Sequence, residues 1–316
     1  MRVLVTGGAG FIGSALVRGL VEVGHEVLVL DDLSTGSRLN LEEVPVRLIE
    51  GDVRDPRTVR DAVDGAEVVF HLAALPSVAR SVADPIRSHA VNVDGTLNVL
   101  MAARDRGVRR LVYTSSSSVY GDTPSLPKHE DMPVQPRSPY AAAKLAGEAY
   151  CRAFAASFAL ETVSLRPFNV FGPRQDPESQ YAAVIPRFAT RMLAGQRPEV
   201  SGDGRQTRDF TYVDNMVEAL ILAAGAGPDA AGEVMNVGCG ARTSLLELVA
   251  ALNRIIGTEL APEFVDPRTG DVRDSEASVE KAGRLIGYRP TVDVREGLAR
   301  TVSWLSGRLT PEGLRR

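Results

Sequence analysis

Cysteine is scarce in this chain, and its scarcity excludes two kinds of site. Among the 316 residues only Cys151 and Cys239 are cysteines, and they stand in unrelated sequence contexts. Two isolated thiols can assemble neither a disulfide framework nor a thiolate zinc site, so we expect no metal centre. We predict that both cysteines are reduced and that they are small residues of the core.

Long apolar runs and an excess of positive charge are missing as well. No apolar run approaches the roughly 20 residues that a membrane-spanning helix needs. The strand-like run 3–6 follows Met1 and Arg2 directly, which leaves no room for a signal peptide. The net charge of -4 provides no basic surface that could displace counterions from nucleic acid. We therefore expect a cytoplasmic protein with neither a membrane nor a nucleic-acid partner.

Short β-branched runs alternate with helix-sized amphipathic stretches through the first half of the chain. Unbroken apolar runs of this kind suit strands that are buried on both faces of a parallel sheet. The alternation predicts an α/β fold with a Rossmann-type, doubly wound parallel sheet. The expected strands are 3–5, 27–30, 46–49, 68–70, 111–113 and 162–165.

The alternation breaks after residue 165. A region rich in proline and glycine covers 167–204, with one helix expected at 183–193, whereas segments 210–224 and 234–237 are expected to return to the sheet. A further helix is expected at 245–256. We therefore predict a dinucleotide-binding domain made of 1–166 plus 206–239, and a smaller, discontinuous C-terminal substrate lobe made of 167–205 plus 240–316.

A glycine-rich turn follows the first expected strand. Glycine allows a tight turn, a close approach of the backbone to a pyrophosphate, and close packing of the next helix on the strand. Because the motif lies between a strand and a helix, it predicts a dinucleotide site. The motif reads Gly7-Gly8-Ala9-Gly10-Phe11-Ile12-Gly13.

Carboxylates follow the second and third expected strands. Asp31 can accept hydrogen bonds from the 2′-hydroxyl of an adenosine ribose and would repel a 2′-phosphate, which favours NAD over NADP. A solvated acidic turn describes Asp32 better. Asp52 is placed either to meet the adenine edge or to cap a helix.

A tyrosine and a lysine are spaced for proton transfer. Tyr140 and Lys144 are four residues apart, so both lie on one face of a helix. A neighbouring ammonium and an oxidised nicotinamide both lower the pKa of a tyrosine from its reference value of about 10. Tyr140 can then take a hydroxyl proton. The hydroxyl-rich turn 114–121 follows the strand 111–113, at the sheet edge where such folds bind ligands.

Taken together, these motifs resemble the extended short-chain dehydrogenase/reductase family that modifies nucleotide sugars, from Met1 to about Leu305. Within it, the chain is most similar to UDP-glucose and UDP-N-acetylglucosamine 4-epimerases, through segments 172–186, 202–210 and 268–273. The general resemblance rests on the glycine motif, Asp31, His71-Leu72-Ala73-Ala74, Asn92, the serine-rich turn, Ser138-Pro139-Tyr140 with Lys144, and the run from Arg166 to Pro173.

The resemblance implies a role for each site residue. Ser116 would pair with the sugar 4-hydroxyl beside Tyr140, and Lys144 would bind the nicotinamide ribose and tune Tyr140. For NAD it implies Gly7, Gly10, Phe11, Ile12, Gly13, Asp31, Asp32, Asp52, Val53, Leu72, Ala73, Ala74, Asn92, Thr114, Tyr140, Lys144 and Pro167. For the UDP-sugar it implies Ser77, Ser116, Asn169, Val184, Arg208, Arg268, Asp271 and Ser275.

Physical chemistry agrees with these substrate roles. Asn169, Arg208 and Arg268 would hold the diphosphate, because the guanidinium fork suits phosphate, and Asp271 would take the uridine ribose diol. A surface ion pair with Asp209 or Asp203 is the alternative for Arg208.

The activity implied is NAD-dependent 4-epimerisation of a UDP-hexose or UDP-N-acetylhexosamine through a transient 4-ketosugar. A UDP-glucuronate 4-epimerase stays open, since Arg80, Arg174 or Arg187 can meet a carboxylate and Pro167 departs from the tyrosine found in many 4-epimerases. A dehydratase or decarboxylase is disfavoured because Ser117 and Ser118 stand where those enzymes carry carboxylates. A non-catalytic NAD-binding regulator is disfavoured because the tyrosine and the lysine are both present.

Two further expectations follow from the resemblance. Ser275 stands where related epimerases line the pocket near the sugar C2 substituent, and a serine leaves room for an acetamido group. The alternative is that Ser275 caps a helix at 276–285. We also expect a homodimer formed through the helices around 93–106 and 140–157.

Overall fold

The computed structural model describes residues 1–176, 183–266 and 273–309. Its centre is a seven-stranded sheet in the order β11-β6-β5-β4-β1-β2-β3, and all neighbouring strands run parallel. This confirms the predicted doubly wound α/β fold. The strands are β1 (Arg2–Thr6), β2 (Glu26–Asp31), β3 (Arg47–Glu50), β4 (Val68–His71), β5 (Arg110–Thr114), β6 (Glu161–Pro167) and β11 (Glu233–Val237).

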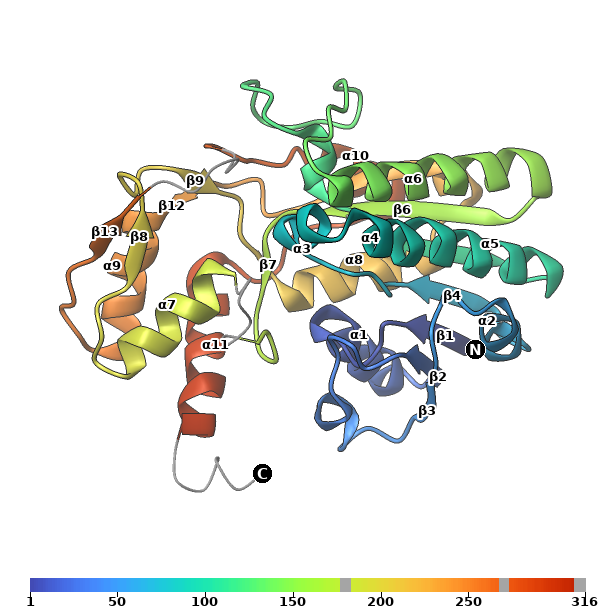
Figure 1. The fold of residues 1–316 in the computed structure, drawn as a ribbon, viewed down its shortest axis with the longest axis horizontal. Coiled ribbons are helices and arrows are strands. Elements are labelled where there is room, and N and C mark those ends of the chain that lie inside the picture. Colours follow the sequence, from blue (N-terminus) through green and yellow to red (C-terminus); the bar gives the residue numbers. More distant parts are fainter. Residues whose placement is uncertain (177–182, 267–272, 310–316) are drawn as a thin grey trace.

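Helices cover both faces of the sheet (Figure 1). Apolar residues of α1 (Phe11–Glu22), α8 (Val213–Gly225) and α10 (Glu280–Ile286) share one hydrophobic cluster with the strands. Those of α2 (Pro56–Val63), α5 (Gly95–Asp105) and α6 (Pro139–Phe158) share the cluster on the other face. Because both faces are covered, the strands need the continuous apolar runs seen in the sequence.

The strand order reverses between β1 and β4. From β1 the chain builds outward through β2 and β3, and then it crosses back to β4, β5 and β6 on the other side. In open α/β sheets a crevice forms outside the carboxyl ends of the strands at such a reversal, and ligands bind there. Two short helices, α3 (Val78–Ala83) and α4 (Pro85–His89), follow β4 at this point.

The smaller lobe packs around its own apolar cluster, which is built mainly from three helices. They are α7 (Val184–Leu193), α9 (Leu245–Ile256) and α11 (Val294–Leu309), and they lie together at the left of Figure 1. The strand pairs nearby are β7 (Val170–Phe171) with β10 (Thr211–Tyr212), β8 (Glu199–Ser201) with β13 (Glu263–Val265), and β9 (Thr207–Arg208) with β12 (Thr243–Ser244).

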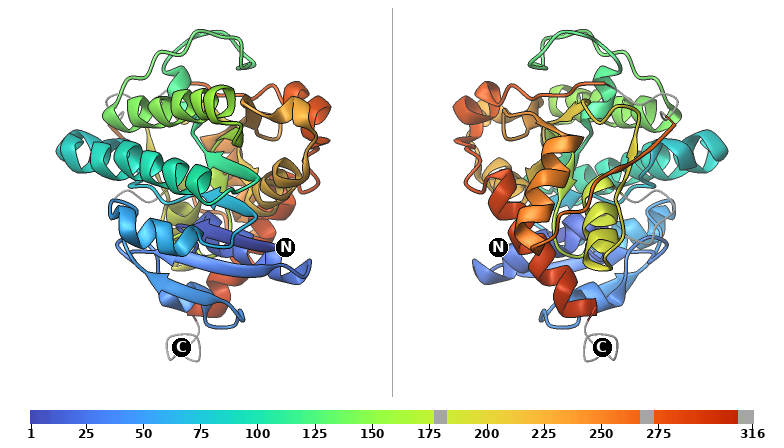
Figure 2. Two further views of the ribbon diagram at one scale, coloured as in Figure 1. Left: turned by 90° about the vertical axis from the view of Figure 1, so that its right-hand side faces the viewer. Right: turned by 90° about the vertical axis from the view of Figure 1, so that its left-hand side faces the viewer.

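The predicted return of the chain to the sheet is observed. β11 pairs with β6, and α8 contributes to the same hydrophobic cluster as α1. The two views in Figure 2 show the sheet domain and the lobe from opposite ends. The stated domain boundaries stay a prediction. No helix in the described residues is long and apolar enough to span a bilayer.

Candidate active site

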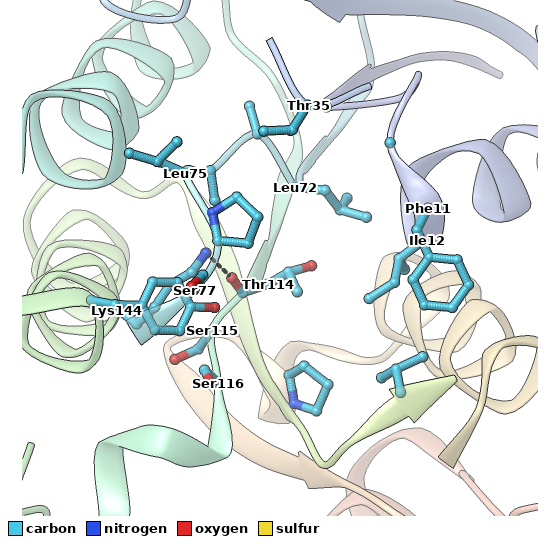
Figure 3. A pocket seen from close by; sticks show the side chains of 18 of the residues that line it. Phe11, Ile12, Thr35, Leu72, Leu75, Ser77, Thr114, Ser115, Ser116 and Lys144 are labelled. Atoms are coloured by element: carbon cyan, nitrogen blue, oxygen red, sulfur yellow. Dashed lines mark hydrogen bonds between the residues drawn. The ribbon is translucent and has the colours of Figure 1, made fainter. Parts of the chain in front are cut away.

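The carboxyl ends of the central strands open into a cleft of about 940 Å³, which residues of the smaller lobe also line. Figure 3 shows the side chains of 18 of the residues that line it. Most residues named from the sequence are brought together here. These lining residues are Gly7, Gly10, Phe11, Ile12, Gly13, Asp31, Asp32, Val53, Leu72, Ala73, Ala74, Ser77, Thr114, Ser116, Tyr140, Lys144, Pro167, Asn169, Arg208 and Ser275.

The glycine motif forms a cradle that side chains cannot occupy. Gly7 has a φ of +73°, and a Cβ there would lie 2.6 Å from the backbone nitrogen of Ala73. A Cβ at Gly13 would overlap the carbonyl oxygen of Gly7. No described side chain caps the start of α1 at Gly10. The first-turn N–H groups of α1 can therefore receive a pyrophosphate, so this cradle fits a dinucleotide.

Asp31 lies at the end of β2 and is buried. Its two oxygens accept hydrogen bonds from the backbone nitrogens of Ala9 and Leu33, each at 2.9 Å. Burial raises the pKa of Asp31, and these two hydrogen bonds oppose that rise. Asp32 instead forms an exposed turn with Ser34, whose N–H donates to it at 2.9 Å. The structure thus separates the two carboxylates as expected from the sequence.

The beginning of α6 places the tyrosine and the lysine in the cleft. The Ser138 hydroxyl caps the helix by accepting from the Ala141 N–H at 3.1 Å, and Pro139 occupies its first turn. Tyr140 follows at once, and Lys144 lies one turn further along. The Lys144 Nζ is 6.0 Å from the centre of the Tyr140 ring.

Lys144 is held against the end of β5. Its Nζ donates to the carbonyl oxygen of Thr114 at 2.7 Å, as drawn in Figure 3. Burial lowers the pKa of Lys144 to about 8, so the ammonium form still predominates at neutral pH. The Thr114 hydroxyl is buried beside it and has no hydrogen-bond partner among the described residues. Such an orphaned group fits a cofactor that brings its own polar atoms.

Tyr140 differs from the expectation in one respect. Burial raises its pKa above the ordinary value, and a hydrogen bond with Ser116 opposes that rise. The pKa is therefore raised and not lowered as predicted, and the Lys144 ammonium donates to the Thr114 carbonyl oxygen rather than to Tyr140. The charge of an oxidised nicotinamide remains a physical cause that would favour the phenolate.

A buried ion pair beneath the cleft was not anticipated from the sequence. Glu148 accepts from the Arg166 Nε at 2.8 Å and from its Nη2 at 2.7 Å, and the Ser115 hydroxyl also donates to Glu148. The Arg166 guanidinium lies 4.7 Å from the centre of the Tyr120 ring. Glu148 is four residues after Lys144, so helical spacing could have placed it on the same face of α6.

On the lobe side, Asn169 joins two backbone segments. Its Nδ2 donates to the carbonyl oxygen of Asp209 at 3.0 Å and to the Ser275 hydroxyl at 3.2 Å. The Asp209 carboxylate is turned inward, where it accepts from three backbone N–H groups. Arg208 lines the cleft, and its Nη1 donates to the Thr207 carbonyl at 2.8 Å.

Ser275 is not a helix cap. The next helix, α10, begins at Glu280 and its N-cap is Val279, so the alternative role of Ser275 as the cap of a helix at 276–285 is not observed. The segment is extended because Asp274 bridges to Thr207, and Ala277 bridges to Lys128. Ser275 lines the cleft, on the side where the resemblance places it.

Three residues named for the site do not line the cleft. The Asp52 carboxylate forms an ion pair with Arg54, while the helix after it is capped by Asp55. The Asn92 side-chain amide forms two hydrogen bonds with the backbone of Leu75: it accepts from the Leu75 N–H at 2.8 Å and donates to the Leu75 carbonyl oxygen at 3.2 Å. Val184 instead packs against the hydrophobic cluster of the lobe.

The remaining residues are those that the structure does not describe, the candidate arginines for a carboxylate, and lining residues with no predicted role. Arg268 and Asp271 lie outside the described residues. Of the arginines considered for a carboxylate, Arg80 lines the cleft, and Arg174 and Arg187 are not among the described lining residues. Lining residues that the sequence analysis missed include Thr35, Arg54, Lys128 and Gln175. They lie on loops; Gln175 belongs to segment 172–186, which carries the resemblance but was given no role, and the other three belong to no motif.

Comparison with known proteins agrees with this geometry. Residues 3–238 match the NAD dependent epimerase/dehydratase family. The chain is 45% identical to a UDP-glucose 4-epimerase of Mycolicibacterium smegmatis over 310 residues, which cover 96% of this chain and 98% of that protein.

Two solved structures have nearly the same fold. A UDP-glucose 4-epimerase from Thermotoga maritima with UDP-glucose has a TM-score of 0.94 and 38% identity, covering 98% of this chain and 100% of that one. A UDP-N-acetylglucosamine 4-epimerase from Methanobrevibacter ruminantium, in complex with UDP-N-acetylmuramic acid, has a TM-score of 0.93 and 38% identity, covering 98% and 99%. The resemblance is thus confirmed, and the chain belongs to the NAD-dependent epimerase/dehydratase family of enzymes.

Proposed function

We propose that this enzyme interconverts a UDP-hexose or a UDP-N-acetylhexosamine with its C4 epimer. The observation that carries the proposal is the meeting of Ser116, Tyr140 and Lys144 in a cleft that also contains the glycine cradle. A tyrosine hydrogen-bonded to a serine can exchange a proton with a sugar hydroxyl. The similarity to UDP-sugar 4-epimerases along almost the whole chain supports the same assignment.

The chain's own residues account for the proton and for the orientation of the sugar. Tyr140 takes the proton of the 4-hydroxyl, while Ser116 holds that oxygen in place. When bound, NAD supplies the acceptor and donor of the C4 hydride. The 4-ketosugar then turns within the cleft while Arg208 holds the diphosphate, and Tyr140 returns the proton. Anchoring the substrate far from C4 leaves the sugar free to rotate. The two N–H groups of the Asn169 amide are engaged with Asp209 and Ser275, so Asn169 positions this side of the cleft.

A dehydratase is the second candidate, because the family includes such enzymes. Elimination of water from the sugar needs an acid near the leaving hydroxyl. Ser117 and Ser118 line the cleft beside Ser116, and neither is a carboxylic acid. The carboxylates among the described lining residues are on other elements, namely Asp31, Asp32 and Asp176. This distribution favours epimerisation.

Ser275 supports the inclusion of N-acetylated sugars. Its small side chain lines the cleft, and its hydroxyl accepts a hydrogen bond from Asn169 at 3.2 Å. A serine leaves space there for an acetamido group. Replacement by tyrosine should therefore abolish activity on UDP-N-acetylhexosamines and spare activity on UDP-hexoses.

The test is incubation of the purified enzyme with UDP-glucose, UDP-N-acetylglucosamine and UDP-glucuronate, followed by separation of the products. We expect the C4 epimer of at least one of the first two. Tyr140→Phe should lower turnover about 100-fold or more, because only the proton transfer is lost, and should leave UDP binding nearly intact. Release of water with a 4-keto-6-deoxy product would support the dehydratase instead, and near-normal turnover of the variant would remove Tyr140 from its role.

A further inference from the structure

Lysine is used sparingly in this protein, and it is concentrated at the cleft. Only three of the 36 basic residues are lysines, namely Lys128, Lys144 and Lys281. Lys128 and Lys144 both line the cleft. An ammonium is a compact, strongly hydrated point charge, and its burial is more costly than that of a guanidinium. Lys128 is therefore, besides Lys144, a second buried lysine in the cleft of a chain whose basic residues are mostly arginines.

The ammonium of Lys128 has few partners within the protein. The residue is only 2% exposed, and its Nζ donates to the hydroxyl of Thr123 at 2.6 Å and to the carbonyl oxygen of the same residue. An ammonium has three donors, so one remains. No carboxylate of the described residues lies within ion-pair distance of this Nζ. Burial lowers the pKa of Lys128, and the charge of Asp122 opposes that fall.

The backbone fixes Lys128 between the two halves of the cleft. Its N–H donates to the Glu276 carbonyl at 2.7 Å, and its own carbonyl accepts from the Ser278 N–H at 2.8 Å. Glu276 directly follows Ser275, and Ser278 lies three residues after it. Thr123, which holds the ammonium, follows the turn that carries Ser116. Lys128 thus lies between the catalytic turn and Ser275, at the part of the cleft assigned above to the sugar.

We propose that Lys128 binds the sugar itself and favours sugars that carry a negative charge. This inference rests on the proposed UDP-sugar function. The remaining N–H of Lys128 donates to an oxygen of a substituent away from C4. A carboxylate oxygen is preferred to a hydroxyl or amide oxygen, because it also neutralises a buried charge that the protein leaves uncompensated. Lys128 would then determine which sugars the enzyme accepts, separately from the proton transfer at Tyr140.

Binding measurements test this without requiring turnover. The dissociation constants of UDP, UDP-glucose and UDP-glucuronate are measured by calorimetry on the NAD-loaded enzyme. The contribution of the sugar to binding is the ratio of the dissociation constant of each UDP-sugar to that of UDP alone. We expect Lys128→Met to raise the dissociation constant of UDP-glucuronate at least about tenfold, that of UDP-glucose by less, and that of UDP by no more than about twofold.

Two further variants separate charge, hydrogen bonding and folding. Lys281→Met removes a lysine that pairs with Glu233 on the outside of the molecule, and it should leave all three constants unchanged. Lys128→Gln keeps donors without the charge, so it should retain part of the UDP-glucose affinity and lose the preference for UDP-glucuronate. Lys128→Gln also replaces the methionine variant as the test if Lys128→Met does not fold. Loss of UDP binding, seen in the dissociation constant of UDP, would reveal such misfolding.

Several outcomes would overturn the inference. Equal losses for UDP and for both UDP-sugars would make Lys128 a structural residue. Equal losses for the two UDP-sugars alone would remove the preference for charge. Failure of both UDP-sugars to bind would overturn it as well. In contrast, binding without any epimer formation would contradict only the proposed function.

Discussion

Burial sets the chemical role of single side chains in this cleft. Lys144, buried against Thr114, has its pKa lowered to about 8, whereas burial raises the pKa of Asp31 and of Tyr140. In each case burial is the largest cause, and hydrogen bonds or neighbouring charges only moderate it. The shifts bring the pKa values of Lys144 and Asp31 closer to neutral pH, whereas the shift of Tyr140 favours its neutral phenol until a bound positive charge opposes it.

Asp31 carries a prediction about the cofactor. Asp31→Ala should raise the dissociation constant of NAD about tenfold or more, because a charged acceptor for the ribose diol is lost. It should also reduce the discrimination against NADP, since the repulsive charge is lost at the same time. Equilibrium titration of the purified enzyme with both dinucleotides measures the two effects.

The neighbouring carboxylate provides the matched control. Asp32 also lines the cleft, but it is engaged with Ser34 in an exposed turn. Asp32→Ala should therefore change NAD affinity much less than Asp31→Ala. Equal effects of the two substitutions would mean that only the general negative charge of the turn matters.

At the scale of elements, a chain of buried hydrogen bonds joins β1, β4 and the segment before α5. The Thr6 hydroxyl lies 2.7 Å from the His71 Nδ1, and the His71 Nε2 lies 2.9 Å from the Thr96 hydroxyl. The Thr96 hydroxyl donates to the Asn92 carbonyl at 2.7 Å, so it must accept from the Nε2–H of a neutral imidazole. Asn92 in turn holds Leu75 at the rim of the cleft.

This arrangement predicts a loss of stability in acid. Burial, followed by the charge of Lys144, lowers the pKa of His71 from 6.5 to about 3. Below 6.5 the unfolded chain takes up a proton that the folded chain refuses, so stability falls as the pH falls from 6.5 towards 3. At about pH 4.5 the loss from this residue is about 3 kcal/mol.

Urea unfolding near neutral pH and near pH 4.5 measures that loss. His71→Gln retains hydrogen-bonding groups but does not titrate, so its stability should decline less between the two conditions than that of the unmodified enzyme. The same decline in both proteins would assign the acid sensitivity to other groups and would leave His71 without this role.

Sequence patterns predicted the elements that depend on local periodicity. The six expected strands, the helices near 183–193 and 245–256, and the placement of Tyr140 and Lys144 on α6 follow from apolar spacing and helix capping. Contacts between distant segments could not be predicted in this way. The extended conformation at Ser275 depends on the bridges of its neighbours to Thr207 and Lys128. The Asp52 carboxylate pairs with Arg54 and does not line the cleft.

For the whole molecule, six of the eleven exposed large hydrophobic residues of the described chain lie on the neighbouring helices α3, α4, α5 and α6. On α3 and α4, Val82 is 64% exposed and Ile86 is 82% exposed. Tyr150 and Phe158 on α6 are also exposed, as is Met101 on α5. These helices pack side by side, and Figure 2 shows α5 and α6 adjacent along one flank. Apolar residues gathered on neighbouring helices are typical of a protein interface.

We predict that this face forms a homodimer, because a symmetric contact would bury the same residues on both copies. Sedimentation of the unmodified enzyme at micromolar concentration should give a dimer. The double variant Ile86→Glu, Tyr150→Glu should give a monomer, because in a symmetric dimer each new carboxylate would be buried at the interface with the second subunit. Phe264→Glu is the matched control, because Phe264 is 56% exposed on β13 in the other lobe, so it should remain dimeric.

The predicted dimer would also bear on catalysis, because α6 carries Tyr140 and Lys144 in its first turns and Tyr150 further along. Docking the exposed side of α6 against a second copy would restrain the helix that positions the proton-transfer groups. The monomeric variant should therefore unfold at a lower temperature and turn over more slowly, with NAD affinity nearly unchanged. An unmodified enzyme that sediments as a monomer would contradict this assembly, and full activity of the monomeric variant would show that α6 is rigid enough alone.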